Sequence, residues 1–178
     1  MKEVNFNNVQ ILDTFWKNVN ELLMQEKDIL WFDHSAIKSI ESWDNIDDLQ
    51  KLKNDNFKIT SLFHNIAGVY AIWINNNQKI IMTYIGQTTD YISHQRIYNH
   101  FISKDARTGS KLNNVKEAIK NGFVIGVSFV KINPKEMRQY VEQNLIRYHF
   151  GESEEKETWN IMGKGRKGKK INIIKLNL

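Results

Sequence analysis

Two runs of β-branched and aromatic residues flank a short asparagine-rich segment in the middle of the chain. Residues 68–74 read GVYAIWI, residues 79–88 read KIIMTYIGQT, and Asn75, Asn76 and Asn77 separate them. Residues of the first kind favour strands, whereas asparagine favours the turn between two strands. The sequence therefore predicts a β-hairpin over residues 68–88, and the other elements must pack against the sheet that this hairpin starts.

Helices account for most of the other predicted elements. An N-terminal helix with one buried stripe, capped at Asn8, is predicted by apolar residues three or four positions apart, namely Val9, Leu12, Trp16, Val19 and Leu23. Further helices are expected around residues 46–52, over 90–102 and 112–120, and from Pro134, which suits a first helical turn, to about residue 149. A strand is expected over 124–132, and residues 170–178 are a candidate final strand. The predicted fold class is α+β, with a small, mainly antiparallel three-stranded sheet flanked by helices and an N-terminal helical extension.

Charge divides unevenly along the chain. Residues 1–60 hold 7 Lys and 11 acidic residues, a net charge of −4, whereas residues 61–178 hold 18 basic and 9 acidic residues, a net charge of +9. A basic segment of this length suggests a polyanionic partner. We divide the chain into a helical extension over 1–62, a domain over 63–165 that contains the sheet, and a basic tail over 166–178. The extension is either a layer that covers the sheet or a dimerisation surface.

Composition excludes several classes of site. The chain has 178 residues and no cysteine, which excludes disulfides, thiolate zinc sites, iron–sulfur clusters and a cysteine nucleophile. None of its five histidines forms an H-x-H or H-x-x-x-H pair, which argues against a zinc site. No stretch approaches the roughly 18 consecutive apolar residues that a membrane span requires, and residues 1–8 contain no apolar run. We therefore expect a cytoplasmic protein without a membrane partner.

The glycine-rich segment 163–170 is strongly basic. It fits two phosphate-binding patterns, G-x-G-x-x-G and G-x-x-x-x-G-K, but both patterns require a turn between a buried strand and a helix, which this segment does not provide. A cationic loop that lies along phosphates and an unstructured tail are the two remaining interpretations. In the first case, the residues expected to contact DNA are Lys164, Arg166, Lys167, Lys169 and Lys170.

Four polar residues follow one another in and after the predicted hairpin. The segment GVY ends at Tyr70 on the first strand, and the segment YIG begins at Tyr84 on the second. Arg96 and His100 are four positions apart and therefore share one face of the helix that leaves the hairpin. Each of these residues alone has an ordinary structural explanation, such as packing in a strand or exposure on a helix.

Glu142 in the segment YVEQNLI and Asn160 after Trp159 complete the pattern. The order Tyr, Tyr, Arg, His, Glu and Asn over about residues 66–165, with GVY in place of GIY, resembles the GIY-YIG nucleases. This resemblance implies the GIY-YIG fold for residues 63–165. It also implies metal-dependent hydrolysis of DNA phosphodiester bonds.

The resemblance further implies a role for each residue. Glu142 would bind Mg²⁺ or Mn²⁺ together with water molecules and a phosphate oxygen. Arg96 would hold the non-bridging phosphate oxygens with its planar, permanently charged guanidinium group. Tyr70 would orient or deprotonate the attacking water, and Tyr84 and His100 would share proton transfer and phosphate contact. Which of these three takes the proton stays open.

Asn160 would orient Glu142 or a phosphate group. A chain of this length without cysteine lacks the zinc domains and long additional modules of other members, and it is most similar to the stand-alone type II restriction endonucleases of the superfamily. Its partner would be double-stranded DNA, bound by a homodimer. The alternatives are a catalytically silent or nonspecific DNA-binding protein of the same fold and a nuclease of a phage or mobile element.

Overall fold

The computed structural model describes residues 9–102, 111–151 and 158–160. The predicted order of elements after residue 66 is confirmed. The elements are β2 (Gly68–Asn75), β3 (Ile80–Thr88), α4 (Ser93–Phe101), α5 (Leu112–Lys120), β4 (Val124–Lys131) and α6 (Arg138–Phe150). Pro134 differs from the prediction, because its ψ of 145° keeps it extended, and a 3-10 turn (Lys135–Met137) separates it from α6. The predicted final strand over 170–178 lies outside the described residues.

The sheet has four strands instead of the three that the sequence predicts. Their order is β1-β4-β2-β3, and every neighbouring pair is antiparallel. The additional strand, β1 (Leu30–Trp31), comes from the N-terminal segment and pairs with Val127 and Gly126 of β4. Two residues are too few to show the alternation by which a strand is detected in a sequence. The α+β class and the antiparallel sheet flanked by helices are confirmed.

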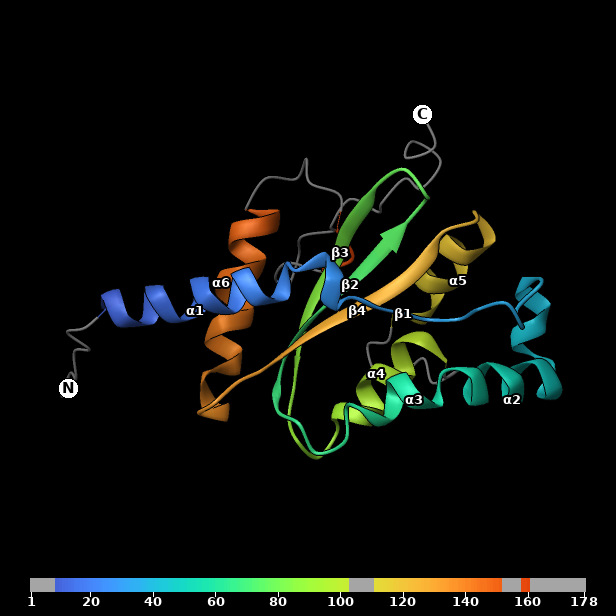
Figure 1. The fold of residues 1–178 in the computed structure, drawn as a ribbon, viewed down its shortest axis with the longest axis horizontal. Coiled ribbons are helices and arrows are strands. Elements are labelled where there is room, and N and C mark those ends of the chain that lie inside the picture. The colour runs from blue at the N-terminus through green and yellow to red at the C-terminus, as the bar shows by residue number, and fades with distance from the viewer. Residues whose placement is uncertain (1–8, 103–110, 152–157, 161–178) are drawn as a thin grey trace, which may run out of the picture.

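Helices cover both faces of the sheet (Figure 1). Alternate side chains of the central strand β2 point to opposite faces, as expected for a strand. Tyr70 and Ile72 belong to a core shared with α2 (Ile46–Asp55), α3 (Phe57–Ser61), α4 and α5. Val69 and Ala71 belong to a second core, shared with α1 (Val9–Leu23) and α6. The site described below lies on the first face, at the edge formed by β3.

The N-terminal segment contributes to both cores. On α1, Trp16, Val19 and Leu23 are buried in the core that contains α6. Trp43, from a 3-10 turn at Ile40–Trp43, and Leu52 of α2 are buried in the core on the other face. The first 62 residues therefore supply one strand and part of the cover on each side of the sheet. In the described part of the chain, no helix is both long and apolar enough to span a membrane.

Candidate active site

Tyr70 and Tyr84 lie on the same face of the hairpin, which α4 covers. In the register of β2 and β3, Tyr70 is opposite Gly86 and Tyr84 is opposite Ile72. The ring centroids of the two tyrosines are 6.0 Å apart, and the ring of His100 on α4 lies 5.6 Å from each of them. The hairpin and the helix after it therefore bring three of the six predicted residues into one aromatic cluster.

Two glycines of the sequence pattern are required by close contacts. A Cβ atom at Gly86 would lie 2.6 Å from the hydroxyl oxygen of Tyr70 and 2.7 Å from the ring of Tyr84. A Cβ atom at Gly68 would lie 2.3 Å from the carbonyl oxygen of Val130 on β4. Glycine is the residue that allows another group to approach a strand this closely. Gly86 therefore makes room for the two tyrosines, and Gly68 allows β2 to lie against β4.

The hydroxyl group of Tyr70 is hydrogen-bonded to both polar residues predicted on α4. Arg96 Nε donates to Tyr70 Oη at 2.9 Å, and His100 Nε2 lies 2.7 Å from the same oxygen. The backbone N–H of Lys111 donates to His100 Nδ1 at 3.0 Å, so Nδ1 carries no proton. A neutral imidazole must then carry its single proton on Nε2. His100 therefore donates to Tyr70 as well, and the phenol oxygen accepts two hydrogen bonds.

Burial determines the charge state of this cluster. His100 is 1% exposed, and its burial, together with the charges of Arg96 and Lys111, lowers its pKa from 6.5 to about 3. Burial and the neighbouring Tyr84 raise the pKa of Tyr70 well above 10, although Arg96 opposes this shift. Burial alone would lower the pKa of Arg96, but the hydroxyl groups of Tyr70 and Tyr84 raise it. At neutral pH the cluster thus holds a guanidinium cation, a neutral imidazole and a neutral Tyr70.

Glu142 approaches the cluster from the other side of the sheet. It lies on α6, which packs along β3 and β2 in the second core. Burial raises the pKa of its carboxyl group above 4.5, while Arg96, the backbone N–H of Gln87 and Arg138 each lower it. Arg138 Nε also donates to the side-chain oxygen of Gln87 at 2.9 Å. Arg96 from α4 and Glu142 from α6 are therefore close enough to interact at the end of β3.

Both polar atoms of the Asn160 amide are bonded to the backbone of β3. Its Oδ1 accepts from the N–H of Ile85 at 2.9 Å, and its Nδ2 donates to the carbonyl oxygen of Ile85 at 2.7 Å. The N–H of Trp159 donates to the carbonyl oxygen of Thr83 at 2.7 Å. Asn160 therefore holds the strand that carries Tyr84, and no hydrogen bond between described residues joins its amide to Glu142.

Lys111 is a residue of this cluster that the sequence analysis did not identify. Its backbone holds His100, and its Nζ lies 4.9 Å from the centroid of the Tyr84 ring. Burial and the charge of Arg96 lower its pKa. The contact joins His100 of α4 to the residue directly before α5, so no period within one helix or strand predicts it. The only signal in the sequence is a basic residue directly before the predicted helix 112–120.

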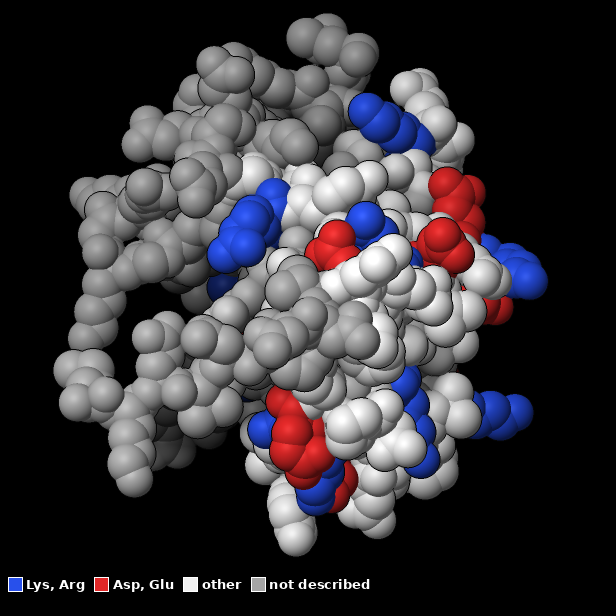
Figure 2. Space-filling view, turned by 90° about the vertical axis from the view of Figure 1, so that its left-hand side faces the viewer, with Lys and Arg blue, Asp and Glu red and all other residues white. Residues whose placement is uncertain are grey.

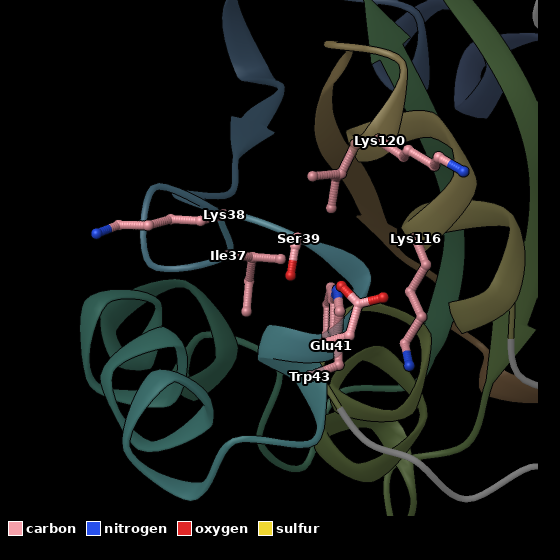
Figure 3. A pocket seen from close by; sticks show the side chains of 8 residues that line it. Ile37, Lys38, Ser39, Glu41, Trp43, Lys116 and Lys120 are labelled. Carbon is pink, nitrogen blue, oxygen red and sulfur yellow. The ribbon is translucent and has the colours of Figure 1, made fainter.

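A pocket of about 300 Å³ lies between the N-terminal segment and α5 (Figure 3). Its lining includes Glu41, Trp43 and three lysines. Lys38 and Lys120 extend away from its centre in Figure 3, and Lys116 Nζ lies 5.2 Å from the ring of Trp43. The lysines therefore do not converge on one point, and none of the lining residues belongs to the tyrosine cluster.

Basic and acidic side chains are interspersed on the face turned to the viewer in Figure 2. The described residues of this face carry no extended patch of one sign. The tail residues predicted to bind DNA, Lys164, Arg166, Lys167, Lys169 and Lys170, lie outside the described residues.

Comparison of the chain with protein-family models, with curated proteins and with solved structures found no match. What the chain does must therefore be inferred from the residues of the site and their geometry.

Proposed function

We propose that this chain is a metal-dependent endonuclease that hydrolyses phosphodiester bonds in DNA with a GIY-YIG-type site. The observation that supports this most directly is the pair of hydrogen bonds that joins Arg96, Tyr70 and His100, at 2.9 and 2.7 Å. These residues are 26 and 30 positions apart in the chain. The order and spacing of residues in the sequence thus select three side chains that are hydrogen-bonded to one another. Tyr84 and Glu142 are also near enough to Arg96 to interact with its guanidinium group.

Hydrolysis requires the site to act on the attacking water, on the leaving ester oxygen and on the non-bridging oxygens of the phosphate. The oxygen of a water molecule forms a bond to phosphorus and loses a proton, the bond from phosphorus to one ester oxygen breaks, and that oxygen takes up a proton. Negative charge grows on the non-bridging oxygens as this happens, and fixed donors aimed at these oxygens lower the barrier. Arg96 would provide such donors through its Nη groups, since its hydrogen bond to Tyr70 uses the Nε–H. The hydroxyl group of Tyr84 is a further hydrogen-bond partner of this guanidinium group.

Burial favours Tyr84 as the residue that contacts the water. Tyr70 has no exposed surface, its oxygen already accepts two hydrogen bonds, and both nitrogens of His100 are in use. Tyr84 retains 7% of its surface. We therefore assign the proton of the water to Tyr84, and we assign Tyr70 and His100 to positioning Arg96. A phenol accepts a proton only as the phenolate, and a positive charge nearby favours that form, so this assignment requires a cation beside Tyr84.

Glu142 is the residue that would hold the metal ion. Among the residues that the structure describes, no group of three His, Asp or Glu side chains forms a metal site. A single half-buried carboxylate nevertheless fits Mg²⁺ or Mn²⁺, because such ions keep several water molecules and bind substrate phosphate oxygens. When bound, the ion would supply positive charge to the phosphate. Glu142 would hold it beside Arg96, which would remain the protein's own donor to the phosphate.

The most specific form of the proposal is a type II restriction endonuclease that acts on double-stranded DNA. One such site cuts one strand, so a double-strand break at a short symmetric sequence requires two sites related by a two-fold axis. A homodimer on DNA is the simplest arrangement that provides them.

Incubation of the full chain with plasmid DNA and Mg²⁺ or Mn²⁺, followed by sequencing of the ends, tests the proposal. Discrete fragments would support a restriction enzyme, and a smear would indicate a nonspecific nuclease. A gel shift without cleavage would mean that the chain only binds DNA. Glu142→Gln should be inactive, whereas Glu136→Gln, which makes the same change at an exposed position before α6, should cleave normally.

A further inference from the structure

Two cations lie close together in the site. Arg96 and Lys111 are both half-buried, and the charge of Arg96 lowers the pKa of Lys111. The ion pairs between described residues join other side chains, namely Lys17 to Asp13, Lys51 to Asp55 and Lys135 to Asp90. Burial and Arg96 account for the shift of the Lys111 pKa, and among the residues that the structure describes no carboxylate contributes to it.

The position of Lys111 is fixed by the same aromatic cluster that holds Arg96. Its N–H is bonded to His100 Nδ1, and Nε2 of that imidazole is bonded to Tyr70, which accepts from Arg96. Its Nζ lies beside the ring of Tyr84, 4.9 Å from the centroid. His100 thus connects the backbone of Lys111 to Tyr70, which is the hydrogen-bond partner of Arg96.

Two like charges in a partly buried site repel each other, and each also loses hydration. An anion that binds to both relieves the repulsion and provides hydrogen-bond acceptors. A phosphate group has several oxygens and forms short, charge-assisted hydrogen bonds with both guanidinium and ammonium groups. A phosphodiester therefore carries a negative charge and enough acceptor oxygens to bind both side chains at once.

We propose that Lys111 is a second phosphate-binding residue, which holds the phosphodiester to be cleaved together with Arg96. The identity of the phosphodiester as DNA rests on the proposed function, whereas the juxtaposition of the two cations is independent of it. Lys111 also supplies the cation that the assignment of Tyr84 requires, since it lies against the ring of this tyrosine. Lys111 would thus bind the phosphate and also place a positive charge beside Tyr84, which receives the proton of the water.

Titration of the full chain with inorganic phosphate tests the phosphate site without any need for cleavage. NMR signals of the lysine Hε and Cε atoms report the pKa of each side chain. Saturating phosphate should raise the pKa of Lys111, because the bound anion favours the charged ammonium group, and Arg96→Gln should weaken this effect. Lys120, exposed at the other end of α5, is the control and should not respond. A Lys111 pKa that is unchanged by saturating phosphate would overturn the proposal.

Cleavage kinetics test whether the site acts on the scissile phosphate. Lys111→Met keeps the side-chain length but removes the charge, and it should lower kcat about 100-fold, as expected for a lost transition-state donor. Lys111→Arg should retain most of the activity, and Lys120→Met should not change it. A Lys111→Met chain with the kcat of the wild type would contradict the proposal.

The pH profile separates Lys111 from its titratable neighbours Tyr70, Tyr84, Arg96 and His100. Lys111 must be protonated to bind phosphate, so kcat/KM should fall as the pH rises through its lowered pKa. Lys111→Arg should shift this alkaline limb upward, because a guanidinium group does not titrate there. An alkaline limb at the same pH in Lys111→Arg would argue against Lys111.

The two proposals can fail separately. If the wild-type chain binds phosphate at Lys111 but leaves DNA intact, the phosphate site would stand and the proposed nuclease function would fail. If Lys111→Met does not fold, the phosphate titration of the wild type decides.

Discussion

Tyr70 Oη accepts hydrogen bonds from Arg96 Nε and His100 Nε2 at a position without exposed surface. A buried donor that loses its acceptor costs about 1–3 kcal/mol. We therefore predict that Tyr70→Phe lowers the free energy of unfolding by about 2–4 kcal/mol, because it leaves both donors unpaired while the ring remains packed. Urea denaturation measures this change.

The matched control is Tyr91→Phe, which removes the same hydroxyl group from a residue that is 89% exposed. It should leave the denaturation midpoint unchanged. If Tyr70→Phe also unfolded at the wild-type midpoint, the two hydrogen bonds would not stabilise the site.

Ionisation of Glu142 should set the acidic side of the pH profile of cleavage. Its carboxyl group must be ionised to bind a metal ion, and burial raises its pKa above 4.5, with Arg96 and Arg138 acting in the opposite direction. Metal-dependent kcat/KM should therefore fall as the pH decreases through this raised pKa, at a higher pH than for an exposed glutamate. Arg138→Gln removes one of the opposing charges and should move the limb to still higher pH. A limb that stays in place in Arg138→Gln would show that Glu142 does not set it.

The same shift predicts a stability effect. A carboxyl group with a raised pKa in the folded state stabilises the fold below its unfolded-state pKa of about 4.5, and this contribution is lost as the pH rises through the folded-state pKa. Glu142→Gln should therefore be more stable than the wild type at pH 7 and similar at pH 4.

The sequence predicts the residues of the site whose positions follow from local geometry. Arg96 and His100 share a helix face because they are four positions apart, and Tyr70 and Tyr84 face α4 because of the strand period and the short hairpin. Lys111 is different, because only the folded chain brings its backbone to His100. The same holds for Asn160, whose contacts with Ile85 join positions 75 residues apart.

At the scale of the element, the β2–β3 hairpin depends on Gly86. A methyl group there would lie 2.6 Å from the Tyr70 oxygen and 2.7 Å from the ring of Tyr84, distances that real Cβ atoms essentially never show. We predict that Gly86→Ala displaces both tyrosines, lowers the cleavage rate at least 10-fold and destabilises the protein by about 1–3 kcal/mol through overpacking. Gly122→Asn is the control, because the space beside Gly122 is open and asparagine tolerates its positive φ of 80°. Wild-type activity in Gly86→Ala would mean that the two rings can shift without harm to the site.

Strands β2, β3 and β4 and helices α1 and α5 are predicted from the sequence to within one or two residues, because each is long enough to show its period. Strand β1 is not predicted by the sequence, because it has two residues, Leu30 and Trp31, within the short apolar run 29–32, which shows no alternation. The absence of a side chain at Gly126 of β4 allows β1 to pack closely against it. A Cβ atom at Gly126 would lie 2.5 Å from the Ile29 side chain and 2.7 Å from the ring of Trp31. Such a close approach between distant segments leaves no periodic signal.

At the scale of the whole molecule, α1 presents two apolar stripes. Trp16, Val19 and Leu23 are buried within the chain, so the predicted stripe covers the sheet. Ile11 and Leu22 are 61% and 52% exposed and are 11 positions apart, close to three helical turns, which places them on one side of the helix. If the homodimer on DNA involves α1, these two side chains are the surface available for it.

Substitutions in the two stripes should therefore have different effects. Trp16→Glu places a charge in a packed core and should destabilise the fold by several kcal/mol, a large part of the roughly 5–15 kcal/mol of a typical domain. Leu22→Lys changes an exposed residue and should stay within about 0.5 kcal/mol of the wild type. Denaturation midpoints distinguish the two variants before assembly is measured.

Sedimentation with and without a duplex that contains the cleaved sequence then tests the dimer. The wild type should sediment as two chains per duplex, and Leu22→Lys should sediment as one chain and cut a single strand, because a lysine on this face places two ammonium groups against each other across a two-fold axis. Gln10→Lys adds the same charge at an exposed position about 100–120° around α1 from Ile11 and Leu22, and it should leave assembly intact. A Leu22→Lys chain that still dimerises and cuts both strands would exclude this face of α1 as the contact. A wild type that remains monomeric on DNA while it cuts both strands in one binding event would exclude the dimer itself.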